Sequence, residues 1–114
     1  MKPLLMTKVK NAFKKVGNDP FQYQFYLKNI NINGDKRGCS GFIINRDTKS
    51  CVYVNTEPSV LSSMQPYLYR YADDNSDYKG YRNRYASSLD ELVKNIVDLT
   101  AKTPQEWQRT EFRL

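Results

Sequence analysis

Residues 21–54 read FQYQFYLKNININGDKRGCSGFIINRDTKSCVYV, and this stretch decides the fold. Apolar and polar side chains alternate along its first part, which predicts a β-strand over 21–32 with one buried face. An Asn-Gly-Asp sequence and a later polar run are turn signals, and apolar strand-like runs at 39–45 and 51–54 follow them. Three consecutive strands joined by short turns predict an antiparallel meander. Two glycines near the start of the second strand indicate a bulge or a close backbone approach there: Gly38 and Gly41.

Amphipathic helices are predicted on both sides of these strands. Over 4–16, apolar residues recur at helical spacing on one face. A capping box at 88–91 begins a second helix, whose apolar stripe continues to residue 101. A further capping signal at Thr103, followed by Pro104 in the first helical position, predicts a short final helix.

Together these elements predict an α+β fold: an N-terminal amphipathic helix, a three- to four-stranded antiparallel sheet and a C-terminal helix packed on one face, the same face as the first helix. The 114 residues suit one domain, so 1–114 is expected to be a single compact domain. The expected core takes one apolar face from each element: Leu5, Val9, Phe13, alternate residues of 21–27, Leu92, Val93, Ile96 and Leu99.

The segment between the meander and the second helix leaves alternatives open. After residue 55, Thr56 or Ser59 could cap a short helix that ends or kinks at Pro66 and carries Val60, Leu61 and Met64. Tyrosines at every second position of 67–71 predict a fourth strand or an extended arm. Residues 78–86 fit either a strand or a loop, and the stretch 67–86 is ordered either alone or only on binding.

The two cysteines are not expected to form a disulfide. If residues 46–50 are the turn of a hairpin, Cys51 lies opposite Ile44 while Cys39 lies near Thr56, so the thiols are not cross-strand neighbours. The N-terminal apolar run is too short for a secretory signal, and no stretch has the apolar length of a membrane span. These features predict a cytoplasmic protein with reduced thiols.

The chain contains no histidine, which excludes the Ser-His-Asp and Cys-His catalytic arrangements and zinc sites built on histidine. Cys39 has a thiol but lacks the usual activating base. An acidic cluster could bind a divalent cation through carboxylate oxygens, although a solvated turn is the simpler interpretation: Asp73, Asp74 and Asp77. We therefore expect a protein that is not an enzyme and that holds no cofactor and no metal.

Charge is unevenly distributed along the chain. The net charge is +6, and residues 1–49 hold ten Lys or Arg against three Asp, whereas the rest of the chain holds eight basic and nine acidic residues. This asymmetry indicates an anionic partner or simply a solubilising face. Richness in asparagine, lysine, tyrosine and isoleucine is typical of proteins from AT-rich bacterial or phage genomes, so a phage or mobile-element origin is a hypothesis.

The stretch from Tyr67 to Tyr85 is the strongest functional signal. It holds six of the nine tyrosines, interleaved with arginine and lysine. Tyrosine and arginine dominate protein–protein hot spots, and the same mixture suits the stacking of unpaired bases. The alternative is a packed strand face with a solvated loop. The main hypothesis is a small accessory or inhibitor protein that binds a protein partner through Arg70, Tyr78, Lys79, Tyr81, Arg82, Arg84 and Tyr85.

The alternative hypothesis is a nucleic-acid-binding domain. It requires the lysine-rich first helix and the Tyr/Arg stretch to share one basic side of the fold. Its contact residues would be Lys8, Lys10, Lys14, Lys15, Arg82 and Arg84. Burial of the first helix in a membrane interface is a weaker alternative, because such a helix more often packs on its own sheet. A homodimer through the sheet edge is also considered, since nothing in the sequence blunts that edge.

Overall fold

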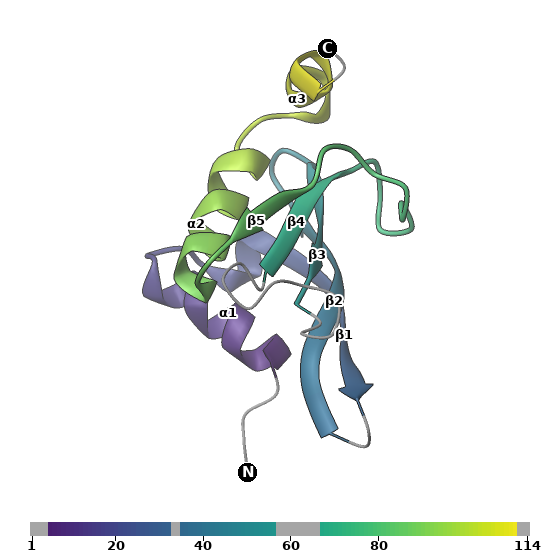
Figure 1. The fold of residues 1–114 in the computed structure, drawn as a ribbon. Helices are drawn as coiled ribbons and strands as arrows, with labels where there is room; N and C mark the ends of the chain where they lie inside the picture. The colour runs from purple at the N-terminus through teal and green to yellow at the C-terminus, as the bar shows by residue number, and fades with distance from the viewer. Residues whose placement is uncertain (1–4, 33–34, 57–66, 112–114) are drawn as a thin grey trace.

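The computed structural model describes residues 5–32, 35–56 and 67–111. Its strands form one antiparallel sheet, in the order β1-β2-β3-β4-β5, in which each strand pairs with its neighbours in sequence (Figure 1). The predicted α+β class is confirmed, and the sheet has one strand more than the four at most that were expected. Along the chain the elements are α1 (Leu5–Lys15), the 3₁₀ turn η1 (Pro20–Gln22), β1 (Tyr23–Ile32), β2 (Asp35–Asn45), β3 (Cys51–Asn55), β4 (Tyr67–Ala72), β5 (Arg84–Ala86), α2 (Leu89–Thr100) and α3 (Pro104–Glu111).

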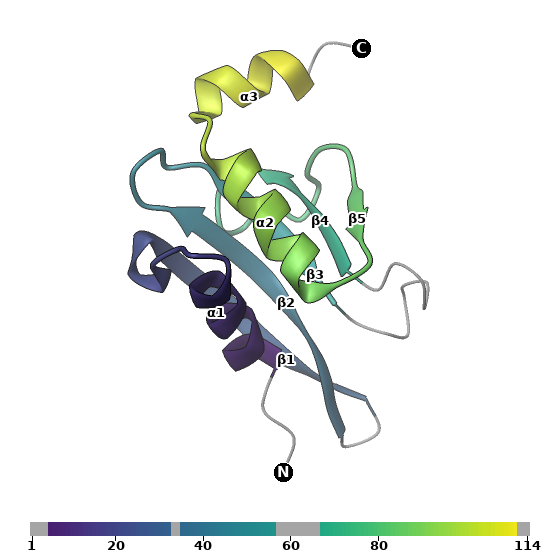
Figure 2. The same cartoon turned by 90° about the vertical axis from the view of Figure 1, so that its left-hand side faces the viewer.

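Helices α1 and α2 lie side by side on one face of the sheet, as the sequence predicts (Figure 2). Each buries its apolar stripe in one cluster with strand side chains: Val9, Phe13, Leu92, Val93, Ile96, Ile43 and Val52. Leu99 is partly buried against this cluster, and the side chain of Leu5 lies outside the described residues. We call the covered side of the sheet the helix face and the opposite side the outer face.

One core prediction is wrong at the start of the first strand. Phe21 was expected to be buried, but its side chain is 84% exposed. The reason is local: the Asp19 carboxylate accepts a hydrogen bond from the Phe21 amide at 2.9 Å and caps the turn η1, so the extended backbone begins two residues later. Tyr23 then takes the buried place, with its ring centroid 4.6 Å from that of Phe13. Leu27 is only half-buried against the same cluster.

Both cysteines occupy the positions expected from the hairpin. Cys51 pairs with Ile44 across β2 and β3, and the Cys39 amide donates to the Thr56 hydroxyl at 2.9 Å. The two thiols are buried and unbridged. Burial raises the pKa of both, and for Cys51 burial with the nearby Asp74 carboxylate raises it to about 12. Both thiols are therefore protonated and unreactive at neutral pH.

The glycine-rich start of β2 shows the predicted close approach and a bulge. The register between β1 and β2 shifts between Ile30 and Asn31, opposite Gly38. At Gly41 the backbone φ is +146°, and a Cβ built there would lie 2.0 Å from the Tyr26 carbonyl oxygen. Only glycine allows the two strands to come this close.

The remaining elements resolve most of the open alternatives. Residues 67–71 are in the fourth strand, β4, and the end of the 78–86 segment forms β5. Helix α2 begins at the predicted cap, where the Ser88 hydroxyl accepts a hydrogen bond from the Glu91 amide. The expected helix in 59–66 lies outside the described residues. Among the helices described, none combines the length and the apolar character needed to cross a bilayer.

Candidate functional site

The outer face of the sheet carries a row of aromatic side chains. Side chains alternate along a strand, so the neighbours of the core residues Ile43 and Val52 point away from α1 and α2. The register places one such residue of each strand from β1 to β4 directly opposite the next. The four residues are Tyr26, Phe42, Tyr53 and Arg70. We call the three aromatic residues among them the aromatic row.

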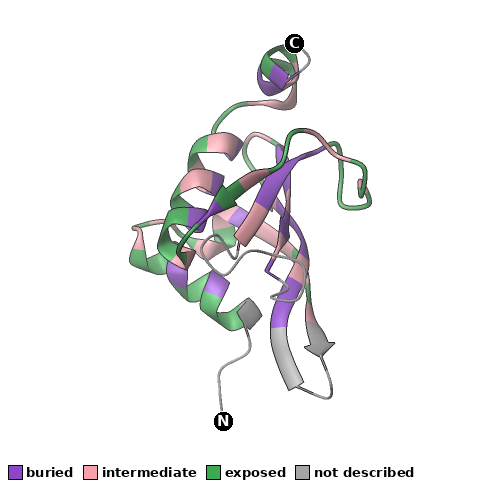
Figure 3. Cartoon of the chain, in the orientation of Figure 1, coloured by how far each residue is buried: buried purple, intermediate pink, exposed green. Residues whose placement is uncertain are grey.

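The loop 73–83, which joins β4 and β5, folds back onto this row. The Tyr78 ring lies edge-on to Phe42, with centroids 5.2 Å apart, and 6.1 Å from the Tyr53 ring. Phe42 is only 1% exposed, whereas Tyr78 above it is 66% exposed. Tyr78 is therefore exposed to solvent above aromatic rings, on a loop most of whose residues are exposed (Figure 3).

Arg70 of β4 holds the loop 73–83 against the outer face of the sheet. Its guanidinium carbon lies 4.5 Å from the centroid of the Tyr53 ring, a cation–π distance. Its Nη1 donates to the Tyr71 carbonyl and its Nη2 to the Asp77 carbonyl, each at 3.1 Å. With 4% of its surface exposed, Arg70 joins the strand to the loop rather than offering a charge to solvent.

Asp77 holds the other side of the loop together. Its carboxylate accepts hydrogen bonds from the backbone amides of Asp73, Lys79 and Gly80 at 2.9, 3.1 and 2.9 Å. Partial burial alone would raise the pKa of Asp77. The three amide hydrogen bonds and the charge of Arg70 outweigh burial, so the pKa lies below the usual value.

Acid is expected to loosen this loop. Because the folded-state pKa of Asp77 is below its unfolded value, the carboxylate stabilises the loop above about pH 4, and this contribution is lost as the pH falls through the folded pKa. Proton–nitrogen NMR spectra recorded from pH 6 to pH 2 should show the amide signals of Lys79 and Gly80 moving towards disordered positions. Asp77→Asn should abolish the transition. Amide signals of the wild type that stay constant to pH 2 would contradict this role.

The structure divides the predicted partner-binding residues into two groups. Tyr78, Lys79, Arg82 and Tyr85 are exposed, whereas Arg70, Tyr81 and Arg84 are partly or fully buried. Arg70 is the first of these. The Tyr81 hydroxyl donates to Asp73 at 2.6 Å, and the ring of Tyr81 meets Trp107 edge-on.

Arg84 is the third of the predicted residues that are not exposed. It lies 2.5 Å from the Glu111 carboxylate of α3, and its guanidinium carbon lies 5.3 Å from the Tyr71 ring centroid. The Glu111 side chain is only 2% exposed. Arg84 therefore contributes to the attachment of α3, and its charge is largely used within the fold.

On the outer face, sequence reasoning missed the exposed aromatic residue Tyr26. Tyr26 is 45% exposed on β1, and it lies on the outer face with Tyr78 and Tyr85, which are 66% and 44% exposed. The alternation of apolar and polar residues in 21–32 already placed Tyr26 on the side of the strand that faces away from the core. The register across the sheet was needed to bring it to the same face as residues more than forty positions later.

The basic residues of the alternative hypothesis come from α1, the loop between β4 and β5, and β5. Helix α1, which carries Lys8, Lys10 and Lys14, packs against β1 and β2, while Arg82 belongs to the loop between β4 and β5. Arg84 is on β5, the opposite edge of the sheet. Lys15 forms an ion pair with Asp90 of α2, with Nζ and Oδ2 2.9 Å apart. The α1 lysines and Arg84 therefore lie towards opposite edges of the sheet.

The acidic cluster is used in loop hydrogen bonds. Asp74 accepts from the Ser76 amide and hydroxyl at 2.9 and 2.7 Å, which lowers the pKa of the Asp74 carboxyl. The Tyr81 hydroxyl bonds to Asp73, and burial together with this carboxylate raises the pKa of Tyr81 to about 12. Within residues 5–32, 35–56 and 67–111, no group of three or more acidic or cysteine side chains is placed to hold a metal ion.

The arrangement is suited to binding through exposed aromatic side chains. Three exposed tyrosines lie on the sheet face opposite α1 and α2, with Tyr26 on one edge strand, Tyr85 on the other, and Tyr78 on a loop that buried contacts hold in place. No protein-family model matches the chain, and no curated protein or solved structure matches it either.

Proposed function

We propose that this chain is a small accessory or inhibitor protein without enzymatic activity, which binds a protein partner through its outer face. The observation that carries the proposal is the exposure of Tyr26, Tyr78 and Tyr85 on one sheet face, with Tyr78 held in place by its ring contact with Phe42. Tyrosine supplies a large contact area at low entropic cost, and it is enriched in the residues that dominate binding energy. A cytoplasmic location is part of the proposal, consistent with two unbridged cysteines.

The charge of this face favours a protein partner over a nucleic acid. A phosphate backbone needs a continuous track of cations. Of the strand side chains described on the outer face, Lys28 is the exposed cation, since Arg70 is buried. The loop 73–83, which folds over this face, contains basic residues together with the exposed carboxylates of Asp73 and Asp74. Mixed charge around exposed aromatic residues is typical of a protein interface with a polar rim.

The proposal is tested with matched substitutions on the two sides of the sheet. The tagged chain is used to capture partners from lysate of the cells that carry its gene, and the partner is then purified for titration. Tyr78→Ser should weaken its binding by roughly thirtyfold, because an interface hot spot contributes about 2 kcal/mol or more. Phe21→Ser, which removes an even more exposed ring away from this face, should leave binding unchanged.

Two outcomes would contradict the proposal. One is a partner whose affinity is the same for Tyr78→Ser, Tyr26→Ser and the wild type, while circular dichroism shows that the variants are folded. The other is self-association: a dimer in analytical ultracentrifugation that Tyr78→Ser converts to a monomer would assign the outer face to a second copy of this chain. The outer face would then be occupied by the second copy, and the proposal that it binds a different protein would fail.

A further inference from the structure

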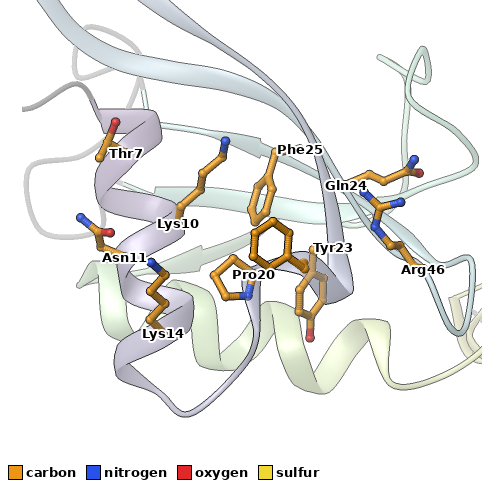
Figure 4. Close-up of a pocket in the computed structure, with 10 residues that line it drawn as sticks. Thr7, Lys10, Asn11, Lys14, Pro20, Tyr23, Gln24, Phe25 and Arg46 are labelled. Atoms are coloured by element: carbon orange, nitrogen blue, oxygen red, sulfur yellow. The ribbon is translucent and has the colours of Figure 1, made fainter.

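A second surface feature lies beside α1, away from the loop 73–83. It is a groove of about 450 Å³ between α1 and the start of β1 (Figure 4). One wall is a stripe of α1, and the other is formed by η1, β1 and the residue that follows β2. We call it the α1–β1 groove, and its central side chains are Lys10, Lys14, Phe21, Phe25 and Arg46.

Three cations line this groove. Lys10 and Lys14 are one helical turn apart on the same face of α1, and Arg46 lies across from them (Figure 4). Every described side chain that lines the groove is neutral or basic, and neither Lys10 nor Lys14 has a carboxylate within ion-pair distance among the described residues. By contrast, the neighbouring Lys15 is neutralised by Asp90. The groove therefore has an unbalanced positive charge.

The groove also displays aromatic rings in fixed positions. Phe21 is 84% exposed because the Asp19-capped turn holds it out from the sheet. Phe25 is supported from behind by the Phe13 ring, with centroids 5.5 Å apart, and Lys10 Nζ lies 5.4 Å from the Phe25 centroid. Phe21 therefore offers an exposed ring face to a ligand in the groove.

We propose that the α1–β1 groove binds a short segment of single-stranded nucleic acid, with a base stacked on Phe21 and phosphates at Lys10, Lys14 and Arg46. A cationic groove with stacking rings is the arrangement that single-strand binding requires. An acidic peptide would need an enclosed pocket for its apolar anchor, because anchor residues contribute when they are fully desolvated. The nearly complete exposure of Phe21 shows that no such pocket surrounds it, whereas a base needs only one face of the ring.

The test is fluorescence anisotropy with labelled twelve-residue oligothymidylate and oligouridylate over a salt series. We expect micromolar binding that weakens with salt at a log–log slope near −2, since each of three phosphate contacts contributes about −0.7 for a single strand. Phe21→Ser should weaken binding about tenfold, and Lys10→Ala with Arg46→Ala should reduce the slope by more than half.

Two control variants make the test specific. Lys15→Ala removes a charge from the same helix that is already paired with Asp90, so it should leave the affinity within twofold of the wild type. Tyr78→Ser, on the outer face, should also leave it unchanged, which separates this site from the proposed protein interface. The proposal is overturned if neither oligonucleotide binds at low salt, if Lys15→Ala weakens binding as much as Lys10→Ala, or if polyglutamate displaces the oligonucleotide at equal charge concentration.

Discussion

Replacing Gly41 with alanine is expected to destabilise the fold by more than about 3 kcal/mol. Two costs combine at this position. The backbone φ of +146° is strained for any residue with a side chain. The new Cβ would also lie 2.0 Å from the Tyr26 oxygen and 2.9 Å from the Leu27 Cα, both of which belong to the backbone of β1 and cannot rotate away. The longest hairpin of the sheet would have to separate.

Urea denaturation followed by circular dichroism measures this loss, with Gly17→Ala as the matched control. Gly17 also has a positive φ, of +85°, but a Cβ there would meet no atom within 4 Å. Its substitution should therefore cost only the backbone strain, about 1 kcal/mol. If Gly41→Ala unfolds at the same urea concentration as Gly17→Ala, the close approach of β1 and β2 is not what stabilises this hairpin.

Hydrophobic periodicity predicted most of the fold because it reports which side of an element is buried. The alternation in β1 and the helical stripes of α1 and α2 were each set by contact with one core. Register also followed from the sequence at the second hairpin, since the turn length places Cys51 opposite Ile44. These are local relations, and each can be seen within about twenty residues.

Features that depend on other interactions could not be predicted in this way. Alternation continues through Phe21, but the Asp19 cap overrides it and turns that side chain outward. Strand β5 has only three residues, and it is a strand because it pairs with β4. Its own sequence is equally compatible with a loop, so nothing short of the tertiary structure decides between the two.

The candidate binding surfaces show the same division. The density of tyrosine and arginine marked the stretch 67–85, but composition does not tell which side chains have internal partners. Arg70 is the clearest case, since its guanidinium bonds to two backbone carbonyls and lies on Tyr53. The sequence also showed that α1 is rich in lysine. It did not show the groove beside this helix, because Phe21 and Arg46, which help to line it, come from other parts of the chain.

Trp107→Ala is expected to destabilise the protein by about 3–5 kcal/mol, as for other large-to-small substitutions of buried aromatic residues. Trp107 is 1% exposed, and its ring is stacked on Tyr71 with centroids 4.3 Å apart and planes 4° from parallel. Its edge contact with Tyr81, at 4.9 Å, connects α3 to the loop 73–83. Loss of the indole should therefore lower the thermal midpoint in circular dichroism and also loosen the loop that carries Tyr78.

Trp107→Phe is the matched control, because the indole ring of Trp107 both stabilises the fold by stacking on Tyr71 and destabilises it by burying an N–H group. Its Nε1–H is buried, and no acceptor among the described residues bonds to it. A buried donor without a partner costs about 1–3 kcal/mol, so phenylalanine removes that penalty while it keeps a ring to stack on Tyr71. The loss for Trp107→Phe should be less than half of that for Trp107→Ala. Equal losses for the two variants would mean that ring stacking contributes nothing to the docking of α3, and the link from this helix to the binding loop would have to be abandoned.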